Sequence, residues 1–479
     1  MGQRMLTRRT FTGSVLKMSA ALSVPWSSFG IAQERAVHSI QLSGESPIEI
    51  PPDFIGLGYE MLSVATPGLL STKNHRYLEL VRGLGPRGVM RIGGIVADYT
   101  RYVANGAPAN DIKNTVITRA NLDEFAGFLK ASGWKAIWSV NFAQGTIPQA
   151  VDEAQAVSEA LGSNLLALEL GNEVENYGKN QPFRAANPYA YESYRAEFDA
   201  WRAAIVQAVP GARFAGPDTA QSLDWVERMA KDADGKIQLL TTHYYRNGQR
   251  RGSAQQLLTP DPRLEEALVR MRVASKQSAI PWRMCEINSF SGGGLPGVSD
   301  TFIGALWTLN TMLRLAQSGC SGVNIETGGN QLGFVSSYSP IQDDGHGVNS
   351  PGVPYYGMLA FAHAFSGCHQ MLSLKTDNLG EGLWAYAFGA AGKPHSIIVV
   401  NMTGLDSQIS VADLGVRRAS VMYLTAPSMD SKSGVTFGGA AVDSAGHWKP
   451  KTTEKLQRES FLVPRMSAAV LRVDNRAGS

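Results

Sequence analysis

Two glutamates in this sequence follow short apolar runs, and their positions indicate acid/base chemistry. Glu173 stands directly after Asn172, where the run Leu165 to Leu170 ends. Glu286 lies in a second strand-like run, ahead of the glycine-rich segment Ser291 to Gly294. Hydrolysis of a glycosidic bond needs one carboxylic acid to protonate the leaving oxygen and one carboxylate to attack carbon or activate water. The pair therefore predicts a glycosidase, in which the Asn172 amide binds a sugar hydroxyl.

A run of polar and aromatic residues supplies further candidates. In Thr241 to Tyr245 the side chains alternate, so His243 and Tyr245 point to one face and Tyr244 to the other. A tyrosine near Glu286 can donate a hydrogen bond that orients the carboxylate. We therefore predict that Tyr245 orients Glu286, and we assign His243 and Tyr244 to substrate binding.

The elements that must position these residues alternate between strand-like and helix-like patterns. Eight apolar or β-branched runs predict strands at Phe54 to Tyr59, Gly88 to Ile92, Ala136 to Asn141, Leu165 to Leu170, Arg213 to Pro217, Leu239 to Tyr245, Arg283 to Ile287 and Gly322 to Glu326. Apolar residues at helical spacing predict helices at Asn121 to Ser132, Tyr189 to Val209, Leu264 to Lys276 and Thr301 to Gln317. This alternation predicts an α/β fold, a (β/α)8 TIM barrel over residues 51–367.

Active sites of such barrels lie at the carboxyl ends of the strands. In this numbering Glu173 follows strand four and Glu286 ends strand seven. The two glutamates are therefore expected at the barrel mouth.

The chain beyond the barrel has a different pattern. From residue 368 to 479, short alternating runs are separated by Gly, Asp, Asn and Ser, for example at Leu383 to Phe388, His395 to Asn401, Ala419 to Leu424 and Ser467 to Val473. This pattern predicts a C-terminal antiparallel β-sandwich domain. Residues 33–50 also alternate, and we expect them to add a strand to that sandwich.

The first 32 residues have the pattern of an export signal. Basic residues surround a modest apolar stretch, and the segment from Thr7 to Phe11 contains the arginine pair of a twin-arginine signal. An ordinary secretory signal with a chance arginine pair is the alternative. Either signal predicts a periplasmic or extracellular protein, and we expect no membrane span after the signal is removed.

Charge and composition exclude several classes of partner. The signal carries four of the 44 basic residues and none of the 41 acidic ones, so its removal changes the formal net charge from +3 to about −1. A near-neutral chain is not suited to bind nucleic acid over its surface. The cysteines at 285, 320 and 368 lie far apart, and the eight histidines show no metal-ligand spacing. We therefore expect no disulfide framework, no metal and no cofactor.

Five segments of the barrel region resemble glycoside hydrolase family 79, the group of β-glucuronidases and heparanase. They are Ile50 to Glu60, Arg91 to Gly94, Leu170 to Glu173, His243 to Gly248 and Glu286 to Ser289, in this order. The resemblance covers the barrel from strand one to strand eight and rests on architecture alone in the C-terminal region. It implies a retaining mechanism with Glu173 as acid/base and Glu286 as the nucleophile.

The resemblance also implies a substrate-binding set. Glu60 and Asp98, at the ends of strands one and two, would bind sugar hydroxyls. The loop from Ser291 through Gly292 and Gly293 to Gly294, together with Tyr338, would bind a uronic carboxylate, since backbone N–H groups of a glycine loop can bind an anion. The arginines at 246, 250 and 251 offer a second means, although a solvated basic loop explains them equally well.

These implications define the expected substrate, a carbohydrate with a terminal β-linked glucuronic acid, and the expected activity, a retaining exo-β-glucuronidase. A long internal segment of the kind removed from heparanase is not evident, and the charge is not strongly basic, so exo action fits better than endo action on a polyanion. Thr327 to Asn330, after strand eight, lies where substrate selectivity could be set. The alternatives are a retaining glycosidase for a neutral sugar, such as a glucoside, xyloside or arabinoside, and a non-catalytic carbohydrate-binding barrel.

Overall fold

The computed structural model describes residues 37–109, 111–178, 183–185, 189–328, 336–344, 349–376, 378–456 and 458–474. The predicted export signal lies outside the described residues, as do Gly329 and Asn330 of the predicted selectivity segment. Within these ranges, none of the helices has the length and apolar character that a membrane crossing requires.

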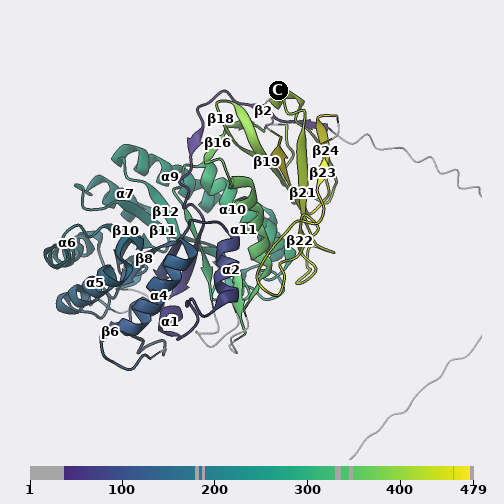
Figure 1. The fold of residues 1–479 in the computed structure, drawn as a ribbon. Helices are drawn as coiled ribbons and strands as arrows, with labels where there is room; N and C mark the ends of the chain where they lie inside the picture. The colour runs from purple at the N-terminus through teal and green to yellow at the C-terminus, as the bar shows by residue number, and fades with distance from the viewer. Residues whose placement is uncertain are drawn as a thin grey trace, which may run out of the picture. The chain divides into compact units, whose positions relative to one another are not determined.

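Eight parallel strands close into a barrel, which confirms the predicted fold class (Figure 1). Around the barrel each strand pairs with its sequence neighbours, and the last strand pairs with the first. The strands are β4 (Gly56–Glu60), β5 (Val89–Gly93), β8 (Lys135–Val140), β9 (Leu165–Leu170), β10 (Phe214–Thr219), β11 (Leu239–Gly248), β12 (Trp282–Ser291) and β13 (Val323–Thr327). All eight predicted strands are present.

The barrel interior is built in layers. Six side chains, those of Val89, Ile137, Ala167, Ala215, Leu239 and Cys285, form a small apolar cluster separate from the main core. Two residues further along three of these strands, on the same face, are Arg91, Ser139 and Glu169. The apolar cluster therefore supports a polar layer that lies closer to the mouth.

Helices connect the strands, and the four predicted helices are present with ends that differ by no more than two residues. Local sequence explains their limits: Thr118 forms a capping box with Asn121, and Gly133 ends the same helix with φ 77°. The helices are α1 (Leu62–Ala65), α2 (His75–Gly83), α3 (Gly94–Ala97), α4 (Arg119–Ser132), α5 (Ile147–Leu161), α6 (Tyr191–Ala208), α7 (Leu223–Lys231), α8 (Ala254–Leu258), α9 (Pro262–Ser278), α10 (Phe302–Gln317) and α11 (Val353–Phe365). The short pairs β6 (Arg101–Tyr102) with β7 (Val116–Ile117) and β14 (Ile341–Asp343) with β15 (Asn349–Pro351) lie in the loops.

The C-terminal region forms the predicted antiparallel sheet domain. Its strands are β16 (Gln370–Leu372), β17 (Leu374–Lys375), β18 (Leu383–Ala390), β19 (Lys393–Asn401), β20 (Ser407–Ser410), β21 (Ala419–Thr425), β22 (Thr436–Phe437), β23 (Glu454–Lys455), β24 (Ser460–Val463) and β25 (Ser467–Val473). The large sheet buries both faces, which explains the unbroken apolar run in β19. Ile397 and Val399 join the core between the sheets, whereas Ile398 and Val400 join the core shared with the barrel.

The N-terminal segment pairs with strands from the other end of the chain. β1 (Val37–Ser39) lies beside β20, β2 (Gln41–Leu42) beside β17, and β3 (Ile48–Glu49) beside β16. Figure 1 shows β2 among the C-terminal strands. The β1–β20 pair is parallel, which an antiparallel sandwich does not predict. The domain boundaries at residues 50 and 367 stay predictions.

A buried hydrogen bond joins barrel helix α10 to the sheet domain. The Tyr386 hydroxyl donates to Asn310 Oδ1 at 2.8 Å, and both residues are buried. We expect Tyr386→Phe to lower the free energy of unfolding by about 1–3 kcal/mol, because the Asn310 oxygen is left buried without its donor. Denaturant titration measures the change. The control is Tyr423→Phe, whose 3.3 Å bond to Glu454 is exposed; equal losses in both variants would contradict the prediction.

Candidate active site

Functional side chains gather at the carboxyl ends of neighbouring barrel strands. Glu173 lies three residues beyond β9, whereas His243 lies within β11. Glu286 does not end its strand as predicted, because β12 continues to Ser291. The register between β11 and β12 shifts at Cys285, which is a β-bulge, and the extra residue lets Cys285 and Glu286 both face the interior.

Two carboxylate residues at the mouth have left-handed backbone conformations. Glu173 has φ 49° and Asp218 has φ 58°. The Glu173 amide N–H donates to the Asp218 carbonyl at 2.9 Å, so the two turns are tied together. Such backbone costs about 1–3 kcal/mol per residue and is found where the surrounding structure fixes a functional side chain.

Arg91, fully buried on β5, is the centre of the polar layer. Its Nε donates to Glu169 Oε2 at 3.1 Å, its Nη1 to Glu286 Oε2 at 2.9 Å, and its Nη2 to Asn172 Oδ1 at 2.8 Å. The same Nη2 also donates to Asp218. A buried guanidinium needs such partners, and its charge in turn holds the side chain of each partner in place.

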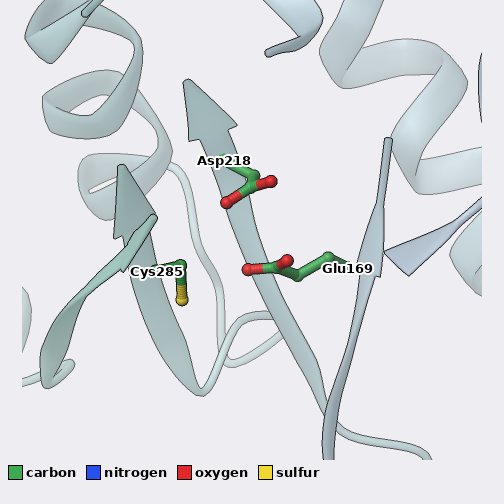
Figure 2. A group of neighbouring side chains, drawn as sticks. All are labelled: Glu169, Asp218 and Cys285. Atoms are coloured by element: carbon green, nitrogen blue, oxygen red, sulfur yellow. The ribbon is translucent and has the colours of Figure 1, made fainter. Parts of the chain in front are cut away.

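Glu169 and Asp218, which both pair with Arg91, reach with Cys285 from three strands into one interior space (Figure 2). Burial would raise the pKa of Asp218, but Arg91 and His243 lower it to about 2. Burial and the charge of Asp218 raise the pKa of Glu169 to about 7. The Arg91 guanidinium supplies to Glu169 and Asp218 the positive charge that a metal ion would otherwise supply. Cys285 is a free, buried thiol.

His243 bridges the two halves of the site. Its Nε2 lies 2.9 Å from Asp218 Oδ1, and its Nδ1 lies 3.3 Å from Glu173 Oε1 and 3.8 Å from Glu286 Oε2. Burial lowers its pKa, but Asp218 and Glu286 outweigh burial and raise the pKa well above its ordinary value. Both ring nitrogens of His243 therefore face carboxylates, and its assignment to substrate binding stays a prediction.

The two tyrosines of this strand point to opposite faces. The Tyr245 hydroxyl donates to Glu286 Oε1 at 2.9 Å, so both oxygens of Glu286 have donors. Tyr244 points the other way and donates to Asp261, the N-cap of α9, at 2.7 Å. The prediction that Tyr244 binds substrate is therefore wrong, since alternation along β11 turns it to the helix side.

Glu60 and Asp98 both lie at the mouth, buried to different degrees. Glu60 Oε2 accepts from the Val96 amide at 2.9 Å, and a Cβ on Gly94 would stand 2.1 Å from that oxygen. Burial and the nearby Glu286 raise the pKa of Glu60 to about 8. Asp98 Oδ1 accepts from the Tyr177 hydroxyl at 2.5 Å, while its Oδ2 has no hydrogen-bond partner among the described residues. Burial raises the pKa of Asp98 well above its ordinary value.

The glycine loop after β12 packs against the segment that carries Tyr338. The Ser337 amide donates to the Gly293 carbonyl at 2.7 Å, and Gly292 and Gly293 have φ 81° and 89°. Ser291, the last residue of β12, is paired with Gly248 of β11. The rings of Tyr245 and Tyr338 lie 6.2 Å apart, so this loop adjoins the residues around Glu286.

The loop after β11 carries the three arginines that the sequence offered as a second means of binding a uronic carboxylate. Arg246 Nη1 lies 3.1 Å from Asp261, and its Nε donates to the Gln256 carbonyl. Arg250 and Arg251 are exposed. Asp261 thus turns Arg246 toward α9.

Sequence reasoning missed several polar residues of the interior as site residues. Arg91, Glu169, Asp218 and Glu326 all face the barrel axis. A signal was present, because Arg91 and Glu169 are charged residues inside otherwise apolar strands. Asp218 lies near the end of strand five, where the strand-end rule applied to Glu173 also applies.

Comparisons with known proteins bear on the family and the fold. Residues 385–471 match the family model of the glycosyl hydrolase family 79 C-terminal beta domain. A beta-glucuronidase of Aspergillus niger is 25% identical over 419 residues, which cover 79% of this chain and 75% of that protein. The predicted resemblance to family 79 is confirmed, and the protein is a glycoside hydrolase.

Solved structures share the fold at low sequence identity. A 4-O-alpha-L-rhamnosyl-beta-D-glucuronidase from Fusarium oxysporum, in a Rha-GlcA complex, has a TM-score of 0.74 at 17% identity, covering 91% of this chain and 100% of that one. A family 51 alpha-L-arabinofuranosidase from Bifidobacterium longum has a TM-score of 0.64 at 15% identity, covering 91% and 99%. Enzymes for different sugars therefore use this architecture.

The position of Glu60 depends on Gly94, and this dependence is testable. Gly94→Ala should reduce hydrolysis of a substrate by at least about tenfold, because its methyl group would displace the Glu60 carboxyl. Gly68→Ala is a matched control, since Gly68 also has positive φ, 81° against 70°, but nothing lies within 4 Å of its added Cβ. Steady-state kinetics of both variants, with thermal melting, separates displacement from backbone strain. Equal kinetic losses would refute the assignment.

Proposed function

We propose that this glycoside hydrolase, whose C-terminal domain is that of family 79, releases terminal β-linked glucuronic acid with retention of configuration. The observation that carries the mechanism is a distance: a carboxyl oxygen of Glu173, a nitrogen of His243 and a carboxyl oxygen of Glu286 lie within 4.8 Å of one another. Retaining glycosidases have carboxyls about 5–5.5 Å apart, and inverting ones about 6.5–9.5 Å. The short separation favours direct attack by one carboxylate over activation of a water.

In the first step Glu286 is the nucleophile. Arg91 and Tyr245 each donate to one of its oxygens, which fixes the carboxylate for attack on the anomeric carbon. The new bond forms as the glycosidic C–O bond breaks, and Glu173 gives its proton to the leaving oxygen. The product of this step is a covalent glycosyl-enzyme.

In the second step the roles of the carboxyls change. Glu173 removes a proton from water, the water oxygen attacks the anomeric carbon, and the bond to Glu286 breaks. His243 faces both carboxyls through one nitrogen and Asp218 through the other, so it keeps them in place through both steps. Asn172 is held through its oxygen by Arg91, which leaves its amide nitrogen to donate to a sugar hydroxyl.

The preference for a uronic acid rests on the neighbouring loop and on the relatives. The glycine loop adjoins Tyr338, and its backbone N–H groups offer an anion site without an arginine. The Aspergillus niger and Fusarium oxysporum proteins are both described as glucuronidases. Exo action is supported by the near-neutral charge of the chain without its signal, and Glu60 and Asp98, near Glu286 and Glu173, offer further contacts for the terminal sugar. The pattern at residues 1–32 supports a protein that works outside the cytoplasm.

Variants of the two glutamates should differ in a specific way. Glu286→Gln should lose about 10⁴-fold or more in kcat, because no nucleophile remains. Glu173→Ala should lose about 10²–10⁴-fold on alkyl glucuronides but much less on 2,4-dinitrophenyl glucuronide in the first step, since a good leaving group needs no acid. Pre-steady-state kinetics measures this step. Glu159→Gln, an exposed residue of α5, is the control. An equal loss on both substrates would remove Glu173 from the acid role.

The stereochemistry and the sugar preference are decided together by one measurement. Proton NMR of an aryl β-glucuronide reaction should show β-glucuronic acid as the first product, before mutarotation. An α-anomer formed first would exclude the retaining mechanism. Faster hydrolysis of the matching aryl β-glucoside, xyloside or arabinoside would exclude the uronic acid preference while leaving the mechanism in place.

A further inference from the structure

The barrel mouth contains a buried carboxyl that the mechanism above does not use. Glu326 lies near the end of β13 and is 5% exposed. It is paired with Gly58 of β4, and its backbone carbonyl accepts from the Asn288 side chain at 2.9 Å. Its backbone is therefore fixed between the first and seventh barrel strands.

The neighbouring strand leaves space for this carboxyl. A Cβ on Gly58 would stand 2.4 Å from Glu326 Oε2, so the carboxyl occupies the place of a side chain. That oxygen is buried and has no hydrogen-bond partner among the described residues. A buried polar atom without a partner is costly, about 1–3 kcal/mol, so its retention at an active site points to a ligand that completes it.

The surroundings of Glu326 favour its neutral form. Burial first, then the charges of Glu286 and Glu60, raise its pKa well above the ordinary value, and the more distant Arg91 and His243 do not offset them. Both cations already face other carboxylates. The titratable groups around Glu326 come from five elements: Tyr59 and Glu60 of β4, Arg91 of β5, His243 and Tyr245 of β11, Glu286 of β12, and Tyr338 in the segment after β13.

We propose that Glu326 is a further substrate-binding residue, which donates a hydrogen bond as a neutral carboxylic acid to the carboxylate of the uronic sugar. This inference rests on the proposed function. Glu326 lies close to both the proposed nucleophile and Tyr338, and the segment of Tyr338 packs against the glycine loop. A neutral acid donates a charge-assisted bond to a carboxylate, whereas an ionised one repels it. Glu326 thus selects for a uronic acid and requires a proton to do so.

A pH dependence follows that separates charged from neutral substrates. As pH rises through the pKa of Glu326, its negative charge weakens binding of a glucuronide, so KM should rise for 4-nitrophenyl β-glucuronide. KM for 4-nitrophenyl β-glucoside, which has no carboxylate, should change far less. Ionisation of Glu60 above about pH 8 acts in the same direction, so variants of Glu326 itself are needed.

The decisive experiment compares Glu326→Gln with Glu326→Ala. The amide of Gln has the shape of the neutral acid and keeps a donor at all pH values. Glu326→Gln should therefore keep kcat/KM for the glucuronide within about threefold of the wild-type value. Its KM should also rise less with pH, because the part of the rise that comes from ionisation of Glu326 is lost. Glu326→Ala should lose about tenfold to a hundredfold on the glucuronide, as expected for one hydrogen bond to a charged group, and little on the glucoside.

Controls keep the outcomes distinct. Glu153→Gln alters another buried carboxyl, bound to Trp138 outside the barrel, and should change neither the sugar preference nor the KM profile. Thermal melting establishes that each variant folds. The proposal is overturned if Gln loses as much as Ala, which would indicate an ionised acceptor. It is also overturned if Ala loses equally on both sugars, or on neither. A wild-type preference for the glucoside would instead overturn the proposed function.

Discussion

The buried charge of Arg91 is the interaction on which the rest of the site depends. A guanidinium inside a barrel must be met by carboxylates and amide oxygens, and here Glu169, Asn172, Asp218 and Glu286 meet it from three other strands or the turns that follow them. Removing one partner of such a network costs about 3–5 kcal/mol, since an uncompensated charge remains buried. The same contacts orient the proposed nucleophile and the amide beside the proposed acid. The contacts that stabilise the polar layer are therefore the same contacts that the geometry of the proposed reaction requires.

The barrel mouth contains more acids than cations, and their environments give them different protonation states. Arg91 and His243 lower the pKa of Asp218 to about 2 against the effect of burial. Burial together with neighbouring acids raises the pKa of Glu60 to about 8, and that of Glu326 well above its ordinary value. In the proposed function, such carboxyls therefore act as hydrogen-bond donors. A site built in this way can bind an anionic sugar without placing an arginine on the substrate.

Glycines in two of the segments that resemble family 79 leave room for charged groups. Gly58 adjoins the Glu326 carboxyl, Gly93 the Arg91 guanidinium, and Gly94 the Glu60 carboxyl. A Cβ added to each glycine would lie between 2.1 and 2.5 Å from the nearest atom of the charged group beside it. The sheet domain acts at longer range. It buries one face of its large sheet on the barrel helices, so the barrel and sheet domain share one core.

The sequence by itself determined the eight barrel strands, the sheet domain and the location of Glu173 and Glu286, because these follow from local hydrophobic period and from where strands end. It also indicated the opposite faces of Tyr244 and Tyr245, although Tyr244 was still assigned to substrate. Only the tertiary structure decided that His243 faces carboxylates, that a bulge at Cys285 turns Glu286 inward, and that Arg91, Asp218 and Glu326 belong to the site. These facts depend on contacts between strands far apart in the chain, and no local pattern specifies which charges will meet across a closed barrel.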